Sequence, residues 1–262
     1  MNSAATPAPG TLYFRCNVCG QRSLTELDRL GREVVSCQTC GSTPRARAII
    51  RVLSSELFER NFALPDFPRR PDIRGIGTTD WEGYALRLAE KFSYQNTFYH
   101  QEPRLDLAAV DLAPELIAAN DFVISSEVFE HVPPPVGRAF QNVWRMLKPG
   151  GVFILTVPFG LQDKTAEHFP ELHEFTIIEK NGSFVLRNVT RLGVVQEFHE
   201  LVFHGGPGTT LEMRLFSERA LYQHLQDAGF TDIKAHRAPD FACGVWWPEP
   251  CSFPLSARKP NL

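Results

Sequence analysis

Two cysteine pairs near the amino end place the strongest constraint on how this chain can fold. Cys16 and Cys19 form one CxxC pair, Cys37 and Cys40 form another, and a glycine follows each pair. Two intervening residues allow a tight turn to direct both sulfur atoms at one ion, and the glycine lets backbone amides approach the sulfurs. Two such pairs about twenty residues apart match a four-thiolate zinc pattern. The spacing therefore predicts a structural Zn²⁺ with no open coordination position.

We expect residues 1–43 to form a small zinc ribbon around this ion, with a short hairpin between the two cysteine pairs that turns near Gly31. Two disulfides or a redox pair are the alternative, which a reducing cytoplasm disfavours. Cys243 and Cys251 are isolated in the sequence. We interpret them as packing residues rather than metal ligands.

Residues 44–70 are expected to form a linking helix followed by a proline-containing linker. Thr43 is the expected N-cap and Pro44 the first helical residue. The helix carries three arginines, which either line a groove for substrate or phosphate or form a solvated face. These arginines are Arg45, Arg47 and Arg51.

The composition is ordinary for a globular protein and bounds the class of partner. The chain has 262 residues, of which 43% are hydrophobic and 22% charged, enough for one α/β domain with a small appendage. A net charge of −3 gives no general attraction to nucleic acid, although residues 1–60 carry eight arginines and only five acidic residues. Residues 1–10 resemble a frayed tail rather than a secretory signal. No apolar run reaches the roughly 18 residues of a membrane span, so we expect a soluble, cytoplasmic protein.

Strand-like and helix-like stretches alternate over residues 71–262, which indicates an α/β domain with a parallel sheet flanked by helices. The strand-like stretches are rich in β-branched and aromatic residues, and the helix-like stretches have apolar residues at helical spacing. The predicted strands are residues 72–77, 94–100, 105–110, 121–127, 152–159, 231–237 and 253–259, and the predicted helices are residues 81–92, 134–151 and 217–230.

Residues 160–216 interrupt this alternation and are predicted to form an antiparallel β insertion. Asn181 and Gly182 lie between two strand-like runs, which is a strong signal for a two-residue hairpin turn. We expect this layer to lie over the carboxyl ends of the parallel strands, where open α/β sheets bind ligands. There it would cap the pocket and determine the choice of substrate.

The stretch DFVISSEVFEHVPPPVGRAFQNVWRMLKPGGVFILTVPF, residues 121–159, resembles a class I S-adenosylmethionine-dependent methyltransferase. The resemblance covers residues 71–160 and 217–258. It implies a Rossmann-like seven-stranded methyltransferase sheet whose last strand runs antiparallel. The expected fold is therefore α/β, with this sheet, the β insertion and the amino-terminal zinc ribbon.

The resemblance also implies where the cofactor binds. Gly75 occupies the position of the family's first-motif acid and Gly77 that of its first glycine, so the loop departs from the family pattern. The missing acid would hold the methionine amino group of S-adenosylmethionine, and we hypothesise that Asp80 supplies this carboxylate instead. Ser126 and Glu127, at the end of the strand predicted at residues 121–127, belong to the same expected site.

Two further acids are implied for the adenosine part of the cofactor. Glu102 follows the second predicted strand, where the family places an acid that accepts hydrogen bonds from both ribose hydroxyls. Asp111 fits the acid that contacts the adenine amino group, with Asp106 as a competitor. The segment between the second and third predicted strands is too short for the family's usual helix.

Methyl transfer needs an aligned nucleophile, exclusion of water and a proton acceptor if the acceptor atom is a hydroxyl oxygen. His131 follows the strand predicted at residues 121–127, and its ordinary pKa suits a general base. It either acts as that base or only lines the pocket. The rival histidines lie in the insertion: His168, His173, His199 and His204.

The leading hypothesis is S-adenosylmethionine-dependent methylation, at oxygen, of a small-molecule or glycan-type acceptor. An RNA methyltransferase that uses the zinc ribbon to bind RNA is the first alternative, although the acidic chain and the lack of aromatic stacking runs disfavour it. A non-catalytic zinc-ribbon binding module is the second. The HGGPG string at residues 204–208 is similar to a hydrolase oxyanion loop, but the chain has no G-x-S-x-G elbow. The loop at Gly77 also lacks the third glycine of a dinucleotide-binding fingerprint.

Overall fold

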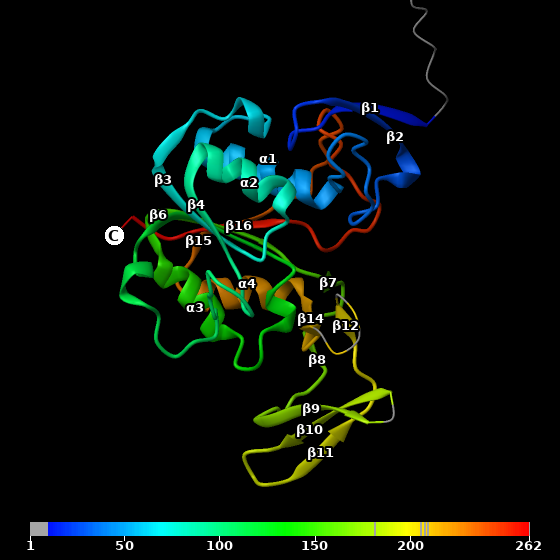
Figure 1. The fold of residues 1–262 in the computed structure, drawn as a ribbon, viewed down its shortest axis with the longest axis vertical. Helices are drawn as coiled ribbons and strands as arrows, with labels where there is room; N and C mark the ends of the chain where they lie inside the picture. Colours follow the sequence, from blue (N-terminus) through cyan, green and yellow to red (C-terminus); the bar gives the residue numbers. More distant parts are fainter. Residues whose placement is uncertain (1–9, 181, 205, 207, 209, 262) are drawn as a thin grey trace, which may run out of the picture.

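The computed structural model describes residues 10–180, 182–204, 206, 208 and 210–261. A six-stranded sheet forms its centre, in the order β15-β16-β6-β5-β3-β4 (Figure 1). Its strands are β3 (Arg70–Thr78), β4 (Phe92–Thr97), β5 (Asn120–Ser126), β6 (Leu147–Thr156), β15 (Thr231–Ala235) and β16 (Leu255–Arg258). Strands β4, β3, β5 and β6 run parallel, whereas β16 is antiparallel to both of its neighbours. The α/β sheet and its antiparallel last strand are therefore confirmed.

The central sheet has six strands rather than the expected seven, because the strand predicted at residues 105–110 does not form. Asn142 donates through Nδ2 to the carbonyl oxygens of Leu107 and Ala109, each at 2.9 Å. A side chain thus provides hydrogen bonds that a neighbouring strand would otherwise supply. Leu105 and Leu107 pack into the core instead of forming a sheet edge.

Helices cover both faces of the central sheet, and alternate residues of β5 point to opposite faces, as strand geometry requires. Phe122 and Ile124 pack on the face with α1 and α2, and Val123 packs on the face with α3 and α4. The helices are α1 (Pro44–Phe58), α2 (Glu82–Lys91), α3 (Gly137–Met146) and α4 (Glu218–Asp227). The 3₁₀ turns are Leu27–Arg29, Leu64–Asp66, Pro114–Leu116 and Phe129–His131. Within the described ranges, no helix is long and apolar enough to cross a membrane.

The two predicted helix N-caps are confirmed. Thr43 Oγ1 accepts a hydrogen bond from Ala46 N at 3.2 Å, and Ser217 Oγ accepts one from Ala220 N at 3.2 Å. Each bond satisfies an amide that has no partner inside its helix.

The amino-terminal head, residues 10–43, contains a hairpin of β1 (Thr11–Arg15) and β2 (Arg22–Glu26). This hairpin encloses the first cysteine pair, whereas the hairpin expected between the two pairs, near Gly31, does not form. The first CxxC motif is itself the turn: Gly20 N donates to Cys16 O at 2.7 Å, with Gly20 in the left-handed region at φ 77°. The following glycine is therefore needed for the turn as well as for access to the sulfurs.

Arg47 of α1 is fully buried and joins the head to the carboxyl-terminal part of the chain. Its Nη1 donates to Ser42 O at 2.7 Å. Its Nη2 donates to Ser36 Oγ and to Gly244 O, each at 2.7 Å. The guanidinium also lies 4.7 Å from the centre of the Phe14 ring. Arg47 thus lies neither on a solvated face nor in a groove.

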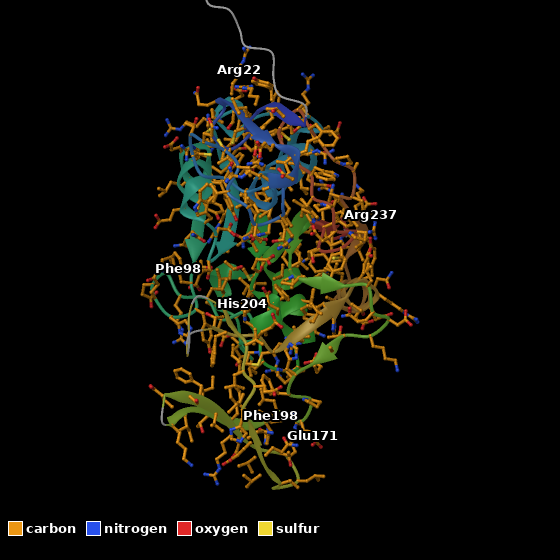
Figure 2. The ribbon with its side chains drawn as sticks, turned by 90° about the vertical axis from the view of Figure 1, so that its right-hand side faces the viewer. Arg22, Phe98, Glu171, Phe198, His204 and Arg237 are labelled. Atoms are coloured by element: carbon orange, nitrogen blue, oxygen red, sulfur yellow. The ribbon has the colours of Figure 1, made fainter. Side chains whose placement is uncertain are left out.

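The insertion has one part that returns to the body of the protein and one that does not. In both views a three-stranded antiparallel sheet, β9-β10-β11, projects from the body instead of lying over the central sheet (Figures 1 and 2). It has a small core of its own, shared with β13. The strands are β7 (Phe159–Gly160), β8 (Ala166–Glu167), β9 (Glu174–Lys180), β10 (Ser183–Val189), β11 (Val195–Phe198), β12 (Phe203–His204), β13 (Thr210–Leu211) and β14 (Arg214–Ser217).

The predicted hairpin in the insertion is present, with Lys180 of β9 opposite Ser183 of β10. Gly182 has φ 77°, as a tight turn requires, and Asn181 lies outside the described residues. The part of the insertion that contacts the body is the β12–β14 segment, in which Met213 N donates to Glu130 O at 2.8 Å. The control of substrate choice by the insertion stays a prediction.

We expect Arg47→Met to lower the free energy of unfolding by about 3 kcal/mol, because it leaves the buried carbonyl oxygens of Ser42 and Gly244 without a donor. Urea unfolding followed by circular dichroism measures this. Arg22→Met is the matched control, because Arg22 is exposed on β2 and its replacement should change stability by less than about 0.5 kcal/mol. Equal losses in the two variants would contradict the structural role of Arg47.

Candidate active site at the carboxyl ends of the parallel strands

The carboxyl ends of β3, β5 and β6 meet at one edge of the central sheet and carry buried hydroxyl groups. Thr78 Oγ1 donates to Ser125 Oγ at 2.9 Å, and the hydroxyls of Ser126 and Thr156 lie 2.9 Å apart. Glu127 follows β5 with φ 57°, a left-handed conformation that is uncommon for a residue with a side chain. Open α/β sheets bind ligands outside this edge. Ser126 and Glu127 are therefore at the edge where the sequence places them.

Gly75 and Gly77 are glycines for different physical reasons. A Cβ on Gly75 would lie 2.1 Å from the Phe122 ring, so packing inside the sheet excludes any side chain there. A Cβ on Gly77 would lie 1.9 Å from Tyr94 Oη and 2.4 Å from Asp80 Oδ2. The first-motif acid is absent because Phe122 occupies its space, while Gly77 permits the close approach of two polar groups.

Asp80 follows β3 and is buried, with 4% of its surface exposed. Tyr94 Oη donates to Asp80 Oδ2 at 2.6 Å, and the Asn96 side chain forms two hydrogen bonds, of 2.9 and 2.8 Å, with the Asp80 backbone. Burial raises the pKa of Asp80 to about 7, against the opposing effects of the Tyr94 and Tyr84 hydroxyls and the charge of Arg45. Within the described structure neither Asp80 Oδ1 nor the neighbouring Tyr84 Oη meets the criteria for a hydrogen bond, so each can bind a ligand group or the other.

Two arginines from the amino-terminal part reach the same edge. Arg32 binds Glu127 through two hydrogen bonds, of 2.9 Å from Nη1 to Oε2 and 2.6 Å from Nη2 to Oε1. Arg45 donates to Ser126 Oγ and forms two bonds of 2.7 Å with the Glu33 carboxylate. Burial alone would raise the pKa of Glu127, but the hydrogen bonds of Arg32 and the charges of Arg32 and Arg45 lower it. Glu127 is therefore ionised at neutral pH.

Glu102 and Asp111 lie in the loop between β4 and β5, and both are exposed. Glu102 Oε2 accepts a hydrogen bond of 2.9 Å from the backbone amide two residues further along its own turn. Asp106, the competitor, accepts a similar bond of 2.8 Å. Across the described residues, no hydrogen bond or ion pair joins these acids to Gly77. The predicted contacts of Glu102 and Asp111 with ribose and adenine stay predictions.

His131 lies at the end of the 3₁₀ turn Phe129–His131, directly after β5. Its Nδ1 lies 2.9 Å from Leu211 O of β13, and its ring centre lies 4.8 Å from that of His204. Burial lowers the pKa of His131, so its imidazole is neutral at pH 7. The preceding Glu130 is fully buried, with Oε1 3.5 Å from His131 Nε2.

The rival histidines of the insertion differ in their surroundings. His168 and His204 share the Glu212 carboxylate, at Nε2–O distances of 2.8 and 3.1 Å. His173 and His199 are exposed. An open groove of about 390 Å³ lies in the insertion and is lined by Ser183, Phe184, His199, Leu201, Phe203 and Gly206.

The sequence reasoning missed Tyr94, Arg32 and Glu212 as residues of the site. Tyr94 pairs with Gly75 across β4 and β3, so a tyrosine beside a glycine-bearing strand was an available signal. Arg32 gave no signal, because its partner Glu127 is 95 positions away and only the docking of the head brings them together.

The four cysteine sulfurs of the head lie close together. Cys16 Sγ and Cys40 Sγ are 3.7 Å apart, Cys19 Sγ and Cys37 Sγ are 3.8 Å apart, and all four lie within 4.8 Å of one another. None of them forms a disulfide. In a tetrahedral zinc site with bonds of about 2.3 Å, the sulfurs are about 3.8 Å apart. The sulfur positions therefore fit a zinc ion.

Residues 30–235 match the family model described as a methyltransferase domain. Among solved structures, the chain is similar to 1,6-didemethyltoxoflavin-N1-methyltransferase from Burkholderia thailandensis, at 15% identity and a TM-score of 0.45, over 82% of this chain and 78% of that one. It is also similar to an amino pentose methyltransferase from Micromonospora echinaspora, at 13% identity and a TM-score of 0.42, over 82% and 90% of the two chains.

A sugar N-methyltransferase from Streptoalloteichus shows 13% identity and a TM-score of 0.46, over 82% of this chain and 86% of that one. No curated protein matches the chain. The family match spans more than half of the chain and includes the Gly77 loop, the residues after β5 and His131. The chain therefore belongs to the methyltransferase domain family and is an S-adenosylmethionine-dependent methyltransferase, as its sequence pattern indicates.

Proposed function

We propose that this methyltransferase methylates a hydroxyl oxygen of a small-molecule or sugar-type acceptor, and that Asp80 holds the methionine end of S-adenosylmethionine. The observation that supports this most directly is the buried Asp80 carboxylate with one unpaired oxygen, beside Gly77 at the carboxyl ends of the strands. A buried carboxylate without a full set of partners is costly unless a cation or donor completes it. The ammonium group of the methionine part is a cation and also a hydrogen-bond donor.

The residues around Asp80 fit the methionine part of the cofactor. An amino-acid ligand carries a carboxylate beside its ammonium, and guanidinium groups bind carboxylates through paired hydrogen bonds. Arg32 and Arg45 lie at this edge and bind the carboxylates of Glu127 and Glu33. We propose that they bind the cofactor carboxylate in the complex. When bound, the cofactor supplies an activated methyl group.

The adenosine part is assigned to the loop that follows β4. Glu102 and Asp111 are exposed on this loop. Their roles toward ribose and adenine stay predictions. Tyr94 and Asp80 lie beside Gly77 on the side to which a Cβ would point.

His131 supports oxygen as the methylated atom. A hydroxyl loses a proton on methylation, and a neutral imidazole can accept that proton. Burial keeps His131 neutral at pH 7, and its Nδ1 is bonded to Leu211 O, so the ring presents Nε2 as the acceptor. The proposed general base is therefore His131 through Nε2.

Three of the eight arginines in residues 1–60 give the RNA alternative no support. Among the arginines of residues 1–60, Arg32, Arg45 and Arg47 are engaged inside the protein by acidic residues, hydroxyls and carbonyls. Phosphate binding by basic patches requires exposed positive charge. The head is therefore better suited to covering the edge of the sheet than to binding RNA.

We propose that the head holds one structural Zn²⁺ through Cys16, Cys19, Cys37 and Cys40. The sulfur separations of 3.7 and 3.8 Å support this, together with the buried Arg47, whose positive charge is near the thiolates. Four thiolates around one dication leave a net negative charge that a guanidinium offsets. Reduced thiols also suit the cytoplasmic location that we propose.

We expect Asp80→Asn to weaken the binding of S-adenosylhomocysteine about tenfold or more, because a charge-assisted hydrogen bond is worth roughly 1.5–3 kcal/mol. Calorimetric titration of the wild type and the variant measures the difference. Asp163→Asn, an exposed position in the insertion, should bind as the wild type does. If both variants bind equally well, Asp80 does not hold the ammonium.

The pH dependence of stability provides a separate prediction. The pKa of Asp80 is about 7 in the folded protein, above the ordinary value of about 3.9, so folding favours the protonated form. The stability that Asp80 contributes is complete below about pH 4 and is lost as the pH rises toward 7. Between pH 4 and pH 8 the wild type should lose up to about 4 kcal/mol that Asp80→Asn retains. Urea unfolding at both pH values measures this, and parallel curves would contradict it.

Replacement of Cys37 by serine should remove one equivalent of zinc per chain relative to the wild type and lower the melting temperature, because metal binding contributes directly to folding. Elemental analysis and thermal unfolding measure the two effects. Cys251→Ser is the control, since Cys251 lies outside the four-sulfur cluster. Unchanged zinc in Cys37→Ser would show that these thiols hold no metal.

A further inference from the structure

A second group of metal-ligating side chains lies where the insertion meets the residues after β5. Glu130, His131 and His204 each offer one ligand atom, and these atoms lie within 4.8 Å of one another. Figure 2 shows His204 between the body of the protein and the projecting sheet. Around a zinc ion bound at about 2.0–2.2 Å, tetrahedral ligand atoms are about 3.4 Å apart, so small side-chain rotations bring these three groups to that separation.

Glu130 is the residue of this group that needs an explanation. Its side chain is fully buried, and neither carboxylate oxygen has a hydrogen-bond partner in the part of the chain that is described. Its Oε1 lies 3.5 Å from His131 Nε2, without the geometry of a hydrogen bond. A buried carboxylate with no partner is strongly unfavourable and points to a missing ion or water.

His131 is oriented as a metal ligand usually is. Its Nδ1 donates to Leu211 O at 2.9 Å, which leaves the lone pair on Nε2, the nitrogen that faces Glu130. Metal-binding histidines commonly donate their other ring N–H to a backbone carbonyl or a carboxylate, which fixes the ring and its tautomer.

The surrounding carboxylates favour a cation at this position. Glu212 lies 3.1 Å from His204 Nε2 and 2.8 Å from His168 Nε2, so it fixes the His204 ring against β13. Burial raises the pKa of Glu130 well above its ordinary value, Glu127 and Glu212 add to this as like charges, and the charge of Arg32 acts in the opposite direction. A dication among these groups would relieve that repulsion.

We propose that Glu130, His131 and His204 bind a divalent transition-metal ion, with Zn²⁺ the preferred ion. Two imidazoles and one carboxylate form a common zinc ligand set that leaves a fourth position open. The fourth position of such a site can take an oxygen or nitrogen atom of a ligand. The ion would also give a function to His204, the first residue of the HGGPG string.

The metal site and the general base use the same nitrogen of His131. A lone pair that coordinates an ion cannot at the same time accept a proton. If the ion is bound, His131 would act as its ligand instead of as the general base, and the ion would lower the pKa of an acceptor hydroxyl bound to it so that solvent water could take the proton. The metal site is tested without donor or acceptor, so its failure is distinguishable from failure of the proposed methylation.

The test measures the zinc content of the full-length protein after exposure to zinc and removal of loosely bound ions by gel filtration. His131→Ala and His204→Ala should each hold one equivalent less than the wild type, and Glu130→Gln should bind the second ion at least about 100-fold more weakly. His173→Ala, another insertion histidine, should match the wild type. Circular dichroism verifies that the variants fold. His204→Ala should fold normally, because the His204 side chain is half exposed.

Cobalt substitution separates this site from the cysteine cluster. Cobalt bound to thiolates gives intense charge-transfer absorption, whereas cobalt bound to imidazole and carboxylate gives only weak visible bands. His204→Ala should lose the weak bands and retain the thiolate absorption. Equal metal content and equal cobalt spectra in the wild type, His131→Ala and His204→Ala would overturn the proposal and leave Glu130 as a buried neutral acid.

Discussion

The ion pair between Arg32 and Glu127 is the contact on which the shape of the active site depends. Arg32 belongs to the head and Glu127 to the carboxyl end of β5, and two short hydrogen bonds hold them together. Both side chains are largely buried, so removing either partner would leave an uncompensated charge. The head is thereby fixed against the edge where the cofactor of this family binds. The proposed zinc would then have a direct consequence for the site, because Arg32 lies in the sequence between the two cysteine pairs that would hold it.

Much of the fold could be predicted from local signals. A run of β-branched and aromatic residues indicated the strand around Phe122 and Ile124, and Thr43 and Ser217 marked the starts of α1 and α4. The prediction of a strand at residues 105–110 was wrong. An apolar run looks the same in the sequence whether its backbone carbonyls accept hydrogen bonds from a side chain, as here, or from a neighbouring strand. The prediction of a hairpin that turns near Gly31 was also wrong, because the hairpin of β1 and β2 turns at the first CxxC motif instead.

The site was predictable where its residues follow a strand and not where they come from a distant segment. Gly77, Asp80 and Glu127 lie at strand ends, so the order of strands places them together. The contacts of Arg32 and Glu212 depend on the docking of separate segments, which no local pattern encodes. Gly75 shows a third case, in which a departure from the family pattern has its cause in the packing of Phe122.

Two buried carboxylates with unpaired oxygens, Asp80 and Glu130, follow neighbouring parallel strands. A folded chain accepts such groups only where something else completes them, since each costs several kcal/mol if left alone. Asp80 has tyrosine hydroxyls beside it and suits an organic ammonium. Glu130 has imidazoles beside it and suits a metal ion. Under the two proposals, the difference in their neighbours would therefore place the cofactor at the β3 end and the acceptor at the β5 end of the same edge.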